Sequence, residues 1–181
     1  MPVTSEQVTT LRAFLAFDPS YERLTRELAG SGRLHGFGEL VYAAFVTAAR
    51  RRFGPTWTSA QVVRFTARAR NGLRTHGIDL DPRATEILIR QALGDRVTSP
   101  YDDNTHARVM LFVLGELISE ERLDEASLDA FLAKARALAD VRLSVRSGQE
   151  LLATGVGVVC AQHLPVGQGV LLPGLPTGTW Q

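Results

Sequence analysis

The stretch that decides the fold is Val109–Ile118, VMLFVLGELI, in which every residue except one glycine and one glutamate is large and apolar. Asp102 or Asp103 precedes it, and aspartate is a common helix cap, so we expect a helix that starts there and runs through Ile118. Apolar residues fall on nearly every side of this helix, which is typical of a buried element. We therefore predict that it lies at the centre of a helical bundle.

Five further helices are predicted upstream, from capping residues and from apolar positions three and four residues apart. The helix after Thr58-Ser59 is the clearest, because Val62, Phe65, Ala69 and Leu73 share one face and Gly77 follows. The other four begin near Thr4 or Ser5, at Tyr21, near Phe37 and after Asp81-Pro82, and they end before Asp18-Pro19, Gly30-Ser31-Gly32, Gly54-Pro55 and Gly94 respectively.

A seventh helix is predicted after Asp124, and its expected buried stripe comprises Leu128, Phe131, Leu132, Ala135, Leu138 and Ala139. The short link to the preceding helix predicts that the two form an antiparallel pair. Beyond about residue 147 the only charge is Glu150, and Gly, Pro, Val and Leu dominate, so we expect no helix there. Two short strands over 155–161 and 166–172, an extended arm and a disordered tail remain alternatives.

The sequence thus predicts an all-α fold with two parts. The first is an irregular bundle of about seven helices over residues 1–143. The second is a non-helical, apolar tail over residues 144–181.

Bulk composition favours a single core, and the cysteine content permits a reducing compartment. The 181 residues are 45% hydrophobic and 22% charged, and a single cysteine, Cys160, leaves no intramolecular disulfide to form. The N-terminus has no signal-peptide pattern, and the most apolar stretch, residues 151–161, is too short for a membrane span. We expect a cytoplasmic protein that does not enter membranes. Nineteen of its twenty basic residues are Arg, which indicates a GC-rich bacterial genome.

Motifs that carry chemistry are missing from the sequence. It contains no phosphate-binding glycine loop, no Gly-x-Ser-x-Gly elbow and no pair of histidines at ligand spacing. Cys160-x-x-His163 has no further zinc ligands, and Asp102-Asp103-Asn104 lacks the rest of a calcium loop. We therefore predict no catalytic residue, metal site or cofactor, and an enzyme with dispersed catalytic residues is the least favoured function.

Charge is distributed unevenly along the chain. Residues 40–78 carry seven arginines and no acid, whereas residues 79–143 carry thirteen acids and eight basic residues. Arg64 and Arg68 share one helix face, which Arg50, Arg51 and Arg52 of the preceding helix would extend, and arginines arranged in this way can bind phosphates. The candidate contacts for an anion or a nucleic acid are Arg50, Arg51, Arg52, Arg64, Arg68 and Arg74. The alternatives are a solvated face and pairing with the acidic half of the chain.

The favoured function is a non-enzymatic helical module that contacts another protein or its own copy, and a regulatory role is one expectation for it. Its expected contact residues lie in the apolar tail and are Leu171, Leu172, Leu175 and Trp180. Nucleic-acid binding through the arginines is the second hypothesis.

Overall fold

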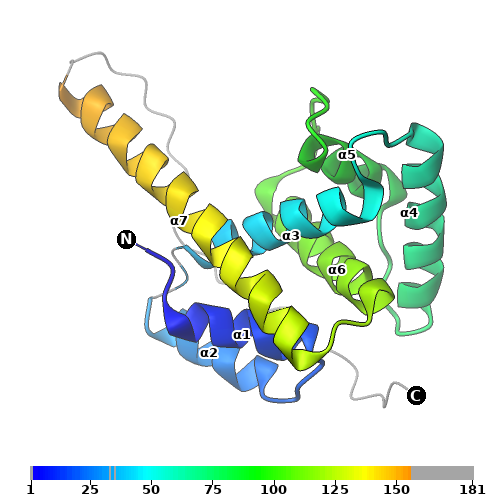
Figure 1. Ribbon diagram of the computed structural model, residues 1–181, viewed down its shortest axis with the longest axis horizontal. Helices are drawn as coiled ribbons and strands as arrows, with labels where there is room; N and C mark the ends of the chain where they lie inside the picture. Colours follow the sequence, from blue (N-terminus) through cyan, green and yellow to red (C-terminus); the bar gives the residue numbers. More distant parts are fainter. Residues whose placement is uncertain (1, 33, 35, 156–181) are drawn as a thin grey trace.

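The computed structural model describes residues 2–32, 34 and 36–155, with side chains up to residue 146. Within these residues the chain forms seven α-helices and no strand, which confirms the predicted all-α bundle (Figure 1). The helices are α1 (Ser5–Leu15), α2 (Tyr21–Gly30), α3 (Phe37–Phe53), α4 (Ser59–Arg74), α5 (Pro82–Ala92), α6 (Asp103–Glu121) and α7 (Glu125–Gly155). None of these helices has both the length and the apolar run needed to cross a membrane.

Five predicted caps start helices as expected. The side chains of Thr4, Thr58, Asp81, Asp102 and Asp124 each accept a hydrogen bond from the backbone N–H three residues later. These bonds satisfy amides that have no partner inside the helix. The helix starts are therefore local properties of the sequence.

Helix α3, and not α6 as expected, lies at the centre. Every residue from Ala43 to Ala49 is buried, and α5, α6, α7 and α1 all pack against α3. Its many alanines allow close approach on all sides, since a methyl group keeps neighbouring helices at short separations. In α6, by contrast, Met110 and Phe112 are only partly buried. Apolar residues on nearly every side of α6 therefore predicted that it is buried. The small side chains of α3, however, make α3 the central helix.

Helices α6 and α7 were expected to form an antiparallel pair, and this is wrong. Each packs mainly against α3, which crosses both of them, and not against the other (Figure 1). The predicted short link is present, because only residues 122–124 join the two helices. The predicted pair does not form because α6 and α7 each bury their apolar side chains against the alanine-rich α3.

Helix α7 continues past residue 147, where we expected helix to stop, and runs to Gly155. That expected end is therefore wrong. Residues 149–153 are Gln, Glu, Leu, Leu and Ala, all strong helix formers, and the glycine at 148 costs only about 1 kcal/mol inside a helix. The strands considered for 155–161 and 166–172 lie outside the described residues, apart from residue 155, which is helical.

Candidate functional site

The arginines predicted as nucleic-acid contacts meet acids from the end of α6. Glu120 Oε2 accepts from Arg52 Nε at 2.8 Å, and Glu120 Oε1 lies 3.0 Å from Arg68 Nη2. Arg51 Nη2 lies 2.7 Å from Glu121 Oε2, an ion pair whose angle falls outside hydrogen-bond geometry. Half of the predicted contact set is therefore neutralised within the chain.

The other three arginines do not complete a patch. Arg50 Nε donates to the Ala92 carbonyl at 3.1 Å, which ties the end of α3 to the end of α5. Arg64 and Arg74 are exposed on α4, and no acid within the described residues forms an ion pair with either. The basic surface is thus smaller than the sequence suggested.

Glu116 lies one turn before Glu120 on α6, close to Gly72 of α4. Burial raises the pKa of its carboxyl, and the negative charge of Glu120 raises it further. No ion pair to Glu116 is present among the described residues. The arginines around this group of acids therefore compensate Glu120 and Glu121 and leave Glu116 without a cation.

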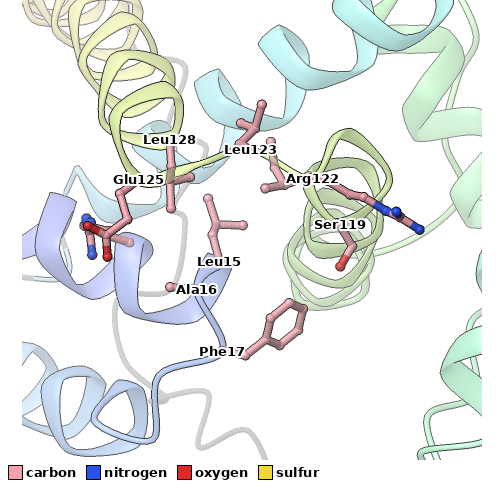
Figure 2. Close-up of a pocket in the computed structure, with 10 residues that line it drawn as sticks. Leu15, Ala16, Phe17, Ser119, Arg122, Leu123, Glu125 and Leu128 are labelled. Carbon is pink, nitrogen blue, oxygen red and sulfur yellow. The ribbon is translucent and has the colours of Figure 1, made fainter. Parts of the chain in front are cut away.

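A shallow hollow of about 310 Å³ lies between the ends of α1 and α6 and the start of α7 (Figure 2). Leu15 and Leu128 point toward each other inside it, while the Arg122 guanidinium extends away from them. Phe17 and Arg122 border the hollow, and they are the two non-glycine residues with positive φ in the described chain, at 54° and 48°. Each terminates a helix in a backbone conformation that normally favours glycine.

A second hollow, of about 340 Å³, lies between α1 and α2, and six of its eight lining residues have a polar side chain. No histidine lines either hollow. His106 instead lies 2.5 Å from Ser99 Oγ, where it holds the loop before α6. In the part of the chain that the structure describes, no three His, Cys, Asp or Glu side chains are grouped as in a metal site.

The C-terminal half of α7 is fastened to the bundle and then projects beyond it (Figure 1). Glu39, at the start of α3, accepts from Arg142 Nε at 3.0 Å and also from Arg146. The Arg142 guanidinium stacks 4.2 Å above the Tyr42 ring. Asp140 Oδ1 accepts from the Val3 backbone N–H at 2.6 Å. These contacts hold α7 in place on one side only.

The opposite side of α7 faces away from the core and is almost uncharged. We call it the α7 face: Ala126, Ala130, Ala133, Lys134, Ala137, Leu138, Val141, Ser144 and Val145, all of them exposed. Val141 and Val145 are 60% and 55% exposed, among the highest values for large apolar side chains in the described chain. A solvated helix face normally carries several charged residues, whereas this one carries only Lys134.

Sequence reasoning missed this surface. Leu138 was assigned to the buried stripe, but it is 37% exposed at the edge of the α7 face. The available signal was the run of alanines opposite the buried stripe, at spacings of three and four, in positions where Lys or Glu is usual. The predicted contacts Leu171, Leu172, Leu175 and Trp180, and the Cys160–His163 pair, lie outside the described residues.

Comparisons of the chain with protein-family models, with curated proteins and with solved structures give no match. A role for the α7 face must therefore be argued from its own chemistry.

Proposed function

We propose that the chain is a self-associating helical module whose α7 face packs against the same face of a second copy. The observation that carries this proposal is the pair Val141 and Val145, each more than half exposed on a face with a single charge. Removing apolar surface from water is favourable at about 25 cal/mol per Å², so covering this face stabilises the pair.

The composition of the face suits a copy of itself. Four alanines and a serine make one half of it flat, and a flat surface packs closely against another flat helix face. Symmetric dimers bury the same patch on both subunits, so a patch that fits itself is sufficient. The face also lies opposite the side of α7 that contacts the bundle, which keeps the two bundles apart.

The size of the face favours moderate affinity. Twenty helical residues span about 30 Å. One helix face of this length buries less area than a standard interface, which covers about 800 Å² on each partner. Association is therefore expected at micromolar or higher concentrations. Much of the favourable free energy of burying apolar surface is needed to offset the translational freedom that the two copies lose. Measurements must reach several hundred micromolar to test it.

The ion pairs of the arginines of α3 and α4 disfavour nucleic-acid binding, the second hypothesis. Glu120 and Glu121 already occupy Arg51, Arg52 and Arg68. A phosphate backbone would have to displace these acids, which lowers the gain from each contact.

The proposal is tested by placing a charge in the face. Val141→Glu with Val145→Glu should weaken self-association at least tenfold, measured by light scattering behind gel filtration. Val63→Glu is the matched control, because Val63 is 48% exposed but lies on α4. Equal association of the double variant and the unaltered chain would overturn the proposal, as would a control that weakens association to the same degree.

A further inference from the structure

We infer that Lys134 is a modification site at which acylation of the side-chain amine strengthens the self-association of the α7 face. This inference rests on the proposed self-association. Two observations carry it: Lys134 is the single lysine of the chain, and it supplies the one charge of the α7 face.

Lys134 lies in line with the two exposed valines that carry the proposed function. At about 100° per residue, Val141 and Val145 each lie within roughly 20° of Lys134 around the axis of α7. Lys134 is itself exposed, and the residues three and four positions before and after it are all apolar. A second helix that runs along the face and covers the two valines therefore also covers Lys134.

The α7 face provides no acid for this lysine. Glu125, Asp129 and Asp140, the three acids between residues 125 and 146, lie at least about 120° from Lys134 around the helix axis. Within the described residues, no acid forms an ion pair with Lys134. A second copy presents the same face. It therefore brings no acid to Lys134, whether the two helices run parallel or antiparallel.

The acids beside the face are already engaged within their own copy. The pairs are Asp129 with Arg12, Asp140 with Arg136 and the Val3 backbone N–H, and Glu39 with Arg142 and Arg146. Association thus removes water from the Lys134 ammonium without giving it a counter-charge, which opposes the contact. The flexible stem lets the ammonium extend to the rim of the contact, so the opposition is moderate and does not abolish association.

Acylation removes the charge that opposes association. The deprotonated amine of Lys134 attacks the carbonyl carbon of an activated acyl donor, that is, an acyl group bound to a good leaving group. A C–N bond forms, the bond to the leaving group breaks, and the nitrogen gives up one proton. The product is a neutral amide, and its acyl group adds apolar surface to the face. Because Lys134 is exposed in the single copy, the donor can reach it.

Acetylation of the full chain with the N-hydroxysuccinimide ester of acetic acid tests this inference. The reagent modifies amines, and Lys134 offers the single side-chain amine, whose acetylation mass spectrometry of a digest verifies. We expect the dissociation constant of the dimer to fall roughly threefold or more, measured by sedimentation equilibrium. Lys134→Arg, treated in the same way, is the matched control. It keeps the charge and offers no lysine, so its dissociation constant should not change.

Substitution gives an independent readout. Lys134→Gln is neutral, like the acetylated side chain, and should also lower the dissociation constant roughly threefold or more. Lys134→Arg should leave it within a factor of about two of the unaltered chain. Both replacements are good helix formers at an exposed position, so the circular dichroism should stay the same. Equal association of the glutamine and arginine variants would contradict the role assigned to the charge.

Failure of this inference differs from failure of the proposed function. If acetylated and untreated chains associated equally, the role of Lys134 would be overturned, but the dimer would still form and the proposed function would stand. If both stayed monomeric at several hundred micromolar, the proposed function and the inference would fall together.

Discussion

Arg142 Nε of α7 lies 3.0 Å from Glu39 Oε2 of α3, and this contact joins two residues 103 positions apart in the chain. Glu39 is only 14% exposed and also pairs with Arg146. One carboxylate thus fixes the direction in which the second half of α7 leaves the bundle. The orientation of the α7 face depends on it.

Glu39→Gln should therefore loosen α7. Both ion pairs lose their charge while the shape of the side chain is kept, so we expect a loss of about 1–2 kcal/mol in the free energy of unfolding. Urea denaturation followed by circular dichroism measures it. Glu22→Gln, an exposed change on α2, is the control, and equal stability of the two variants would contradict the anchoring role of Glu39.

Arg122→Gly should stabilise the protein. Arg122 ends α6 with a φ of 48°, and a side chain in this left-handed region costs about 1 kcal/mol that glycine does not. Arg122→Ala separates the two contributions, because it removes the guanidinium but keeps the strained backbone. Thermal melts should show a gain for glycine alone; a similar gain for alanine would mean that the side chain, and not the backbone, is responsible.

Glu116→Gln should raise the melting temperature at pH 7. Burial raises the pKa of Glu116 above its unfolded value, and the charge of Glu120 adds to this, so the folded state holds the proton more tightly. Its ionisation destabilises the fold as the pH rises from the unfolded pKa through the folded pKa. The advantage of the variant should therefore disappear as the pH falls below about 4, where both states are protonated. If the melting temperatures of the variant and the unaltered chain differed by the same amount at every pH, the raised pKa of Glu116 would be contradicted.

The arginine surface should not bind nucleic acid. Because Arg52 and Arg68 share Glu120, we expect no saturable binding of a random-sequence duplex at low salt. The control is the double variant Arg64→Glu, Arg68→Glu. Binding that weakens steeply with salt and disappears in this variant would restore the nucleic-acid hypothesis.

The sequence alone predicted the helices and their starts, because a cap such as Thr58 or Asp81 acts on backbone groups three residues away. It did not predict which helix is central, since this depends on how the small side chains of α3 fit four neighbours at once. It offered pairing of the arginines with the acidic half of the chain as an alternative, but it did not predict that Glu120 pairs with Arg52, 68 residues earlier in the chain. Such contacts, like the exposure of the α7 face, exist only once the helices are packed.

Sedimentation equilibrium of the unaltered chain, from a few micromolar to several hundred micromolar, tests self-association most directly. The account predicts that the weight-average mass rises with concentration from 19.8 kDa toward twice that value. The rise should be absent in the Val141→Glu, Val145→Glu variant. A mass that stays at 19.8 kDa over the whole range would contradict the account.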